Sequence, residues 1–216
     1  MSIVGRGFHI RKGGIINFVR DPGHTTLTYI RSGGAAAAIA GLSYGAAGYL
    51  DKPGMSGYAS ALVSVLSVAI PALLLGGLFG LRQRLLLGAE RSFTRGAGFV
   101  LGCFGTMLGV IAALGPEQIV LGLTSLGLWW WAPLFAGLTL MGLATLPLKA
   151  QRRLGALVLA SGMLGWVSLL TDPAFPGVLV PMRPVHVAFA AAFCLSCVLW
   201  GGGLFVGAHR LGRPKP

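Results

Sequence analysis

Charged residues, and acidic ones above all, are scarce in this sequence of 216 residues. Asp, Glu, Lys and Arg make up 10% of the chain, and only 5 of these residues are acidic. A typical soluble domain has about 25% charged residues, which cover its surface in water. With 55% hydrophobic residues, this chain lacks such a cover. The composition excludes a soluble enzyme, a secreted disulfide scaffold and a disordered chain, and it predicts an integral membrane protein.

Asp, Glu, Lys and Arg are absent from six long apolar segments of the chain. We expect each segment to be a transmembrane α-helix, because backbone groups in lipid must bond within their own segment. Proton relays, ion-coupled carriers and voltage sensors need charges inside the membrane, so the sequence argues against these mechanisms. The six segments span residues 32–50, 56–81, 96–114, 126–148, 154–170 and 184–208.

The 17 basic residues alternate between the connections of these segments. Five lie in the N-terminal segment, four in 82–95, three in 149–153 and three in the C-terminal tail, whereas the other connections hold only Lys52 and Arg183. Cytoplasmic loops carry the excess of Lys and Arg, so we expect both termini in the cytoplasm of a bacterial inner membrane or another energy-transducing membrane. The predicted parts are a basic arm (1–31), a six-helix domain (32–209) and a basic tail (210–216).

The net charge of +12 also indicates contact with a membrane surface. Basic residues confined to alternate loops indicate contact with anionic lipid headgroups, and no nucleic-acid partner is predicted. Within the arm, β-branched and aromatic residues at 15–19 and 25–30 flank Asp21-Pro22-Gly23, which indicates a short β-hairpin. An isolated hairpin is marginal in water, so a partly disordered arm beside the headgroups is the alternative.

Glycine is in excess, with 35 residues. Lipid tails are as apolar as leucine, so helices in a membrane associate through small residues four apart, which let their backbones approach closely. Such pairs occur in four of the six segments and predict a compact bundle, whose partner helices belong to this chain or to another. The predicted packing residues are Gly41, Gly45, Gly76, Gly80, Gly98, Gly102, Gly105, Gly109, Gly203 and Gly207.

Serines and tryptophans near the outer ends of the segments have two interpretations. The first is interhelical hydrogen bonding by the serines and interfacial anchoring by the tryptophans. The alternative is a cavity for a neutral or amphipathic ligand. The residues of this predicted cavity are Ser60, Ser64, Ser67, Trp129, Trp130 and Trp131. Further predicted anchors are Tyr49, Tyr58 and Trp166.

Cysteines and histidines indicate neither a redox centre nor a metal site. Cys194 and Cys197 have the C-x-x-C spacing, but they and Cys103 fall inside predicted spans, where cysteine usually acts as a small apolar side chain. His186 and His209 are roughly 35 Å apart along one predicted helix, too far to share a ligand. No cofactor is predicted.

Three classes of function remain. The first is a non-catalytic membrane subunit that packs with a larger complex and stabilises it. The second is a substrate-binding or transport component, because the size, the six spans and the Ala36-x-x-x-Ala40 pair resemble the substrate-capturing subunits of energy-coupling-factor vitamin importers. The third is an intramembrane enzyme, for which no catalytic group is evident, since Ser161 and His209 differ in depth by roughly 10 Å.

Overall fold

The computed structural model describes residues 23–50, 57–87, 92–114, 131–171 and 183–211, and every regular element in these ranges is helical. Apolar residues without charge dominate each helix, so backbone hydrogen bonds form along the chain rather than between strands. The helices are α1 (His24–Leu50), α2 (Gly57–Leu86), α3 (Phe93–Leu114), α5 (Trp131–Thr145), the 3₁₀ helix η1 (Lys149–Gln151), α6 (Arg152–Leu170) and α7 (Arg183–Leu211).

Four stretches of the described residues are long and apolar enough to cross a membrane. The helix α5 is apolar but shorter, and the predicted start of its segment, 126–130, lies outside the described residues. The helix α1 contains seven alanines and five glycines, whose side chains are less hydrophobic than the leucines of the other helices. The fold is that of a helical, multi-pass membrane protein. The four stretches are Gly57–Leu86, Phe93–Leu114, Lys149–Leu170 and Pro184–His209.

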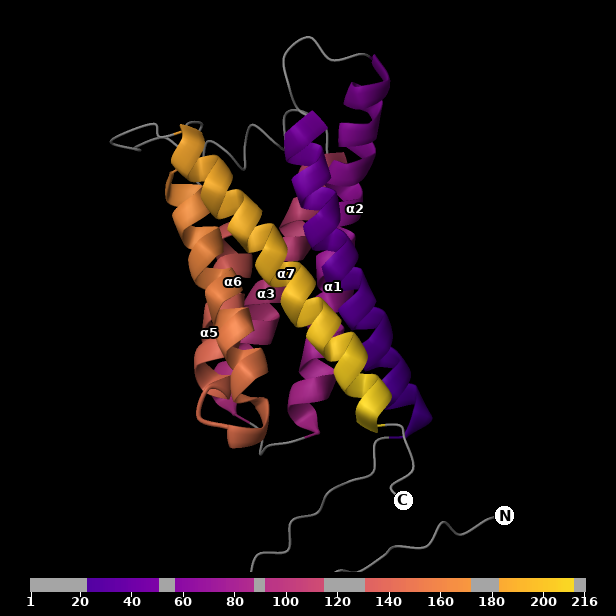
Figure 1. Cartoon of the computed structure of the whole chain (residues 1–216), viewed down its shortest axis with the longest axis vertical. Helices are drawn as coiled ribbons and strands as arrows, with labels where there is room; N and C mark the ends of the chain where they lie inside the picture. The colour runs from indigo at the N-terminus through magenta and orange to yellow at the C-terminus, as the bar shows by residue number, and fades with distance from the viewer. Residues whose placement is uncertain (1–22, 51–56, 88–91, 115–130, 172–182, 212–216) are drawn as a thin grey trace, which may run out of the picture.

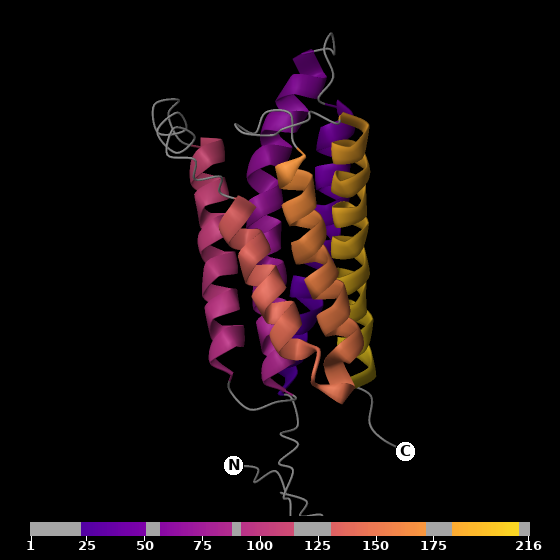
Figure 2. The same cartoon turned by 90° about the vertical axis from the view of Figure 1, so that its left-hand side faces the viewer.

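The six described α-helices form a closed ring in the order of the sequence (Figures 1 and 2). Each helix packs against the next, and α7 returns to pack against α1. Consecutive helices run in opposite directions, so α1 begins at the end of the bundle where α7 finishes (Figure 1). The basic residues near the helix termini are thereby gathered at that same end, except for Arg183, with which α7 begins at the other end.

The expected β-hairpin is wrong in its second strand, because residues 24–31 form the first turns of α1. The backbone N–H groups of Thr26 and Leu27 donate to the carbonyl of Gly23, which starts the helix. Ile30 is completely buried in the bundle, so tertiary packing outweighs the β propensity of this stretch. The helix α1 therefore begins at His24, within the predicted arm 1–31. The first predicted strand lies outside the described residues.

The interior of the ring is filled by large apolar side chains. They belong to one continuous cluster that draws on all six described helices. Close packing of this kind matches the density of organic crystals, so a change of one methyl group there alters stability. The largest fully buried apolar side chains include Trp200, Ile30, Leu78, Leu81, Leu134, Leu138, Met141 and Leu204.

Glycines set the closest approaches between helices of the ring. A Cβ atom added to Gly33 of α1 would lie 2.5 Å from the Cα atom of Gly80 of α2. On the other side of α1, a Cβ atom on Gly34 would lie 2.6 Å from the carbonyl oxygen of Gly201 of α7. A side chain at these positions would push the backbones apart. The helix α1 is thus held between two neighbours at backbone contact.

Candidate functional site

The predicted packing glycines differ in how closely another helix approaches them. For Gly41, Gly80, Gly98 and Gly102, an added Cβ atom would lie 3.0 Å or less from an atom of another helix. Around Gly76 and Gly45 the space is looser, with nearest atoms at 3.4 Å and 3.9 Å, and Gly105 and Gly109 are buried in α3. Gly203 and Gly207 differ from all of these, because a Cβ atom there would meet nothing within 4 Å.

The packing glycine of α7 is Gly201, which the four-residue spacing does not single out. Three consecutive glycines, 201–203, leave the register of the helix undetermined in the sequence. The side that faces α1 is decided by the crossing of the two helices. Other glycines at backbone contact that the spacing also missed are Gly33, Gly34, Gly137 and Gly142.

Part of α7 presents glycine to the outside of the described bundle. Gly202, Gly203 and Gly207 have no atom within 4 Å of an added Cβ, and Leu199 and Val206 nearby are about half exposed. Glycine inside a helix costs about 1 kcal/mol relative to alanine. Packing within the described chain offers no compensation for these three glycines. We call the surface formed by Leu199, Gly202, Gly203, Val206 and Gly207 the outer glycine face.

The path of α7 across the bundle explains this exposure (Figure 1). In the first half of α7, Ser196 accepts a hydrogen bond of 2.8 Å from the hydroxyl of Ser161 of α6. In the second half, Gly201 packs against α1, and the ribbon diverges from α6. Gly203 and Gly207 lie in this second half of α7, and an added Cβ atom at either position would meet nothing within 4 Å.

Of the predicted cavity, the structure describes the side chains of Ser64, Ser67 and Trp131, and their contacts are separate. Ser64 and Ser67 are exposed on α2, and the Ser67 hydroxyl donates locally to the Ser64 carbonyl at 2.7 Å. Trp131 instead lies at the start of α5, where its ring stacks on Phe135 with centroids 5.9 Å apart. The side chain of Ser60, and Trp129 and Trp130, lie outside the described residues.

Trp131 belongs to a cluster of five aromatic rings from four helices. Its ring also meets Tyr44 of α1 edge to face, at 5.5 Å between centroids. Phe135 contacts Trp166 of α6 at 6.3 Å and Phe193 of α7 at 5.4 Å. Each such pair contributes about 0.5–1.5 kcal/mol beyond burial. The cluster ties α1, α5, α6 and α7 together, and the sequence spacing did not reveal it because its members are far apart in the chain.

The predicted interfacial anchors differ in exposure. Tyr58 is 91% exposed on α2, as an anchor in a lipid interface requires. Trp166 is half-buried and belongs to the aromatic cluster. The side chain of Tyr49 lies outside the described residues.

The cysteines are free thiols packed in the bundle. Cys197 is completely buried, and the carbonyl of Cys194 lies 2.6 Å from the position of a Cβ atom on Gly41. Among histidines, His186 Nδ1 donates to the carbonyl of Ser168 at 2.8 Å, which joins α7 to α6. No group of three or more His, Cys, Asp or Glu residues that could hold a metal ion occurs in the described part of the chain.

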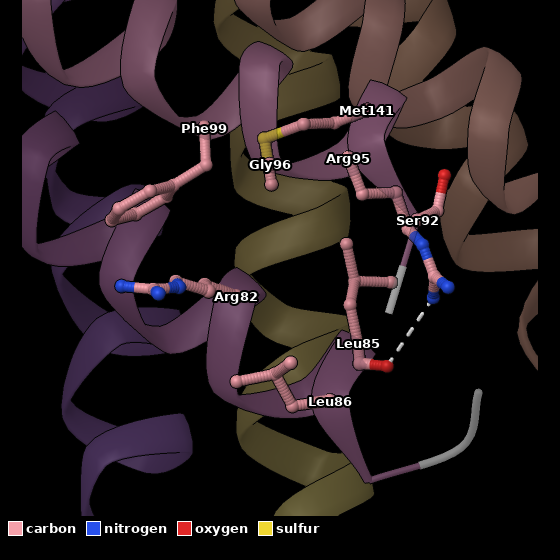
Figure 3. A pocket seen from close by; sticks show the side chains of 8 residues that line it. All are labelled: Arg82, Leu85, Leu86, Ser92, Arg95, Gly96, Phe99 and Met141. Atoms are coloured by element: carbon pink, nitrogen blue, oxygen red, sulfur yellow. Dashed lines mark hydrogen bonds between the residues drawn. The ribbon is translucent and has the colours of Figure 1, made fainter. Parts of the chain in front are cut away.

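A pocket of about 410 Å³ lies where α2 ends and α3 begins (Figure 3). The Arg82 guanidinium lies over the Phe99 ring, 4.6 Å from its centroid. From α3, Arg95 Nη1 donates to the carbonyl of Leu85 at 3.5 Å. Figure 3 shows the two arginines on opposite sides of Leu85. The lining residues are Arg82, Leu85, Leu86, Ser92, Arg95, Gly96, Phe99 and Met141.

Comparison with known proteins adds no family to this description. No family model, curated protein or solved structure matches the chain. The class that the fold defines is a helical membrane protein with several membrane-crossing helices. The features that bear on its function are the outer glycine face, the packed interior and the pocket between α2 and α3.

Proposed function

We propose that the protein is a non-catalytic membrane subunit that packs with a larger membrane protein complex and stabilises it. In this proposal the chain crosses the membrane six times. Six helices that alternate in direction support an even number of crossings. Four of them are long and apolar enough to cross a membrane, and α1 and α5 are the other two proposed spans. The proposed membrane is a bacterial inner membrane or another energy-transducing membrane.

The proposed orientation has both termini in the cytoplasm. Basic residues mark the cytoplasmic ends of membrane helices. The end of the bundle at which α1 begins and α7 finishes carries nearly all basic residues of the described helices, which supports this orientation. These residues are Arg31, Arg82, Arg84, Arg95, Lys149, Arg152, Arg153 and Arg210.

The outer glycine face is the observation that carries the proposal. Gly203 and Gly207 are four residues apart, which is the spacing that lets a second helix approach a membrane helix at backbone distance. Neither glycine meets an atom of the described bundle. A transmembrane helix of another subunit is the partner that this surface fits, because only a helix satisfies its own backbone groups in lipid.

The packed interior favours this function over transport. Trp200, Leu78 and Leu138 come from three helices and are each 1% exposed or less. A transported molecule would have to displace such side chains from one close-packed cluster. The energy-coupling-factor-like alternative has one supporting observation, the pocket of about 410 Å³, which lies at one end of the bundle rather than through it. The third class, an intramembrane enzyme, lacks support from Ser161, which bonds to Ser196 instead of to a histidine.

Replacement of the outer glycines tests the subunit proposal. We expect Gly203→Leu combined with Gly207→Leu to abolish co-purification of the partner from native membranes, because leucine side chains would block close approach. The chain should keep its own thermal unfolding temperature, since no described atom lies near either position. Quantitative mass spectrometry of tagged variants in mild detergent measures the loss.

A matched control uses Ala191→Leu, which enlarges an exposed small residue on α7 away from both glycines. It should leave co-purification unchanged. A monodisperse wild-type chain with no stoichiometric membrane protein attached would contradict the proposal. So would a double variant that retains its partner at the wild-type level.

A further inference from the structure

We propose that the pocket between α2 and α3 binds the phosphate group of an anionic amphiphile. Among the eight described residues that line the pocket, the two charged ones are both arginines and none is acidic. The planar guanidinium group matches the geometry of phosphate oxygens and forms paired hydrogen bonds with them. This site is distinct from the outer glycine face, and its occupancy does not depend on a partner subunit.

Arg82 is positioned to bind from one side of the pocket. Its guanidinium lies over the face of Phe99, which attracts the cation and limits its motion. The guanidinium has five N–H donors, and a contact with the ring face occupies no acceptor-directed hydrogen bond, so the donors stay available to a ligand. The Arg82 side chain is exposed, and a molecule from the interface therefore reaches it directly.

The beginning of α3 adds positive potential to the same pocket. The first N–H groups of a helix lack acceptors within it, and the helix dipole favours an anion there. Gly96 lies in the first turn of this 22-residue helix, and a Cβ atom on it would meet nothing within 4 Å. The Gly96 N–H itself donates to the carbonyl of Ser92 at 3.1 Å, so this end of α3 contributes its dipole and open space to the pocket.

The apolar part of the pocket selects an amphiphile over a free phosphate. Leu85, Leu86 and Met141 line the pocket beside the arginines. The surface of α3 continues outward with exposed Phe93, Val100 and Phe104, which face lipid in a membrane-spanning bundle. A phospholipid with an anionic headgroup satisfies both surfaces at once, because its phosphate pairs with arginine and its acyl chains cover α3.

Competition between lipids in nanodiscs tests this site. Nanodiscs with equal amounts of phosphatidylglycerol and phosphatidylcholine hold the full-length chain, and native mass spectrometry counts the lipids retained after release. We expect wild-type protein to retain phosphatidylglycerol preferentially. Arg82→Gln combined with Arg95→Gln should weaken this retention by about tenfold or more, because the positive charge of the pocket lining is lost.

The matched control removes the same two charges at the same end of the bundle. Arg152 and Arg153 are exposed at the start of α6 and do not line the pocket. Arg152→Gln combined with Arg153→Gln should change retention by less than about twofold, because neither side chain lines the pocket and solvent and salt screen exposed charges. Equal losses in the two double variants would overturn the proposal in favour of a diffuse basic surface.

A second arm separates lipid from soluble phosphate. Inorganic phosphate and glycerol 3-phosphate, added at millimolar concentration to the detergent-solubilised chain, should leave its unfolding temperature unchanged, whereas phosphatidylglycerol should raise it. Stabilisation by the soluble phosphates to the same extent would overturn the amphiphile assignment. If the double variant does not fold, Arg82→Gln alone changes an exposed side chain and should lower retention about threefold or more. An unchanged retention in that variant would also overturn the proposal.

Discussion

The surroundings of single glycines vary more than their spacing does. Gly34 and Gly201 meet at backbone distance, whereas Gly203, two residues later, has no neighbour within 4 Å. The same residue type thus serves two purposes on one helix. Toward α1 it permits close approach, and toward the outside it leaves a surface without side chains. Substitution by alanine distinguishes the two, because a single methyl group fits only where space exists.

At the residue scale we expect Gly137→Ala to destabilise the bundle. An added Cβ at this position would lie 2.5 Å from the backbone nitrogen of Gly102, and backbone atoms of two helices cannot both give way. The expected loss is about 1–3 kcal/mol, seen as a fall in the thermal unfolding temperature in detergent. Gly202→Ala is the matched control, and the same methyl group there should cause no loss. Equal unfolding temperatures for both variants would contradict this explanation of the glycines.

Among the elements, α1 and η1 show how tertiary contacts determine helix ends. The helix α1 begins at His24 because Ile30 packs into the bundle, although its first residues have strand-forming character. The short η1 is fastened to α2 by Gln151, whose Nε2 donates to the carbonyl of Arg84 at 3.2 Å. This bond joins residues 67 positions apart in the chain. The last carbonyls of a helix have no N–H donor within the helix, and this bond supplies a donor for one of them in α2.

At the element scale, Gln151→Ala should loosen the connection between α5 and α6. Gln151 is 4% exposed, and its loss leaves the Arg84 carbonyl without this donor in a partly buried place. Such a carbonyl costs about 1–3 kcal/mol, and the unfolding temperature should fall accordingly. Lys149→Ala, at an exposed position of the same 3₁₀ helix, should change it by less than about 0.5 kcal/mol. Faster hydrogen exchange at the end of α2 in the Gln151 variant alone would locate the effect.

The whole molecule is a ring of antiparallel helices with a strongly asymmetric charge. Since consecutive helices reverse direction, the connection after α2 and the one before α6 fall at one end of the bundle (Figures 1 and 2). Tyr58, near the start of α2, lies toward the opposite end. The proposed topology therefore predicts which positions lie on the same side of the membrane.

Cysteine labelling in intact cells checks this topology. Ser92→Cys and Arg152→Cys should react with a membrane-impermeant maleimide only after the cells are opened, and Tyr58→Cys should react before. The wild-type chain is the control, because Cys194 and Cys197 are buried and Cys103 is partly buried in α3. Labelling of Ser92→Cys and Arg152→Cys from opposite sides would contradict the six-span arrangement.

Composition and charge alone determined that this chain is a helical membrane protein and which segments become helices. These are local properties, because a run of apolar residues without charge forms its hydrogen bonds within itself in lipid. The start of α1, the choice of Gly201 over its neighbours and the meeting of Arg82 with Phe99 were decided only by the tertiary structure. Each depends on how two helices cross, and crossing is set by contacts between residues distant in the chain, which no local pattern contains.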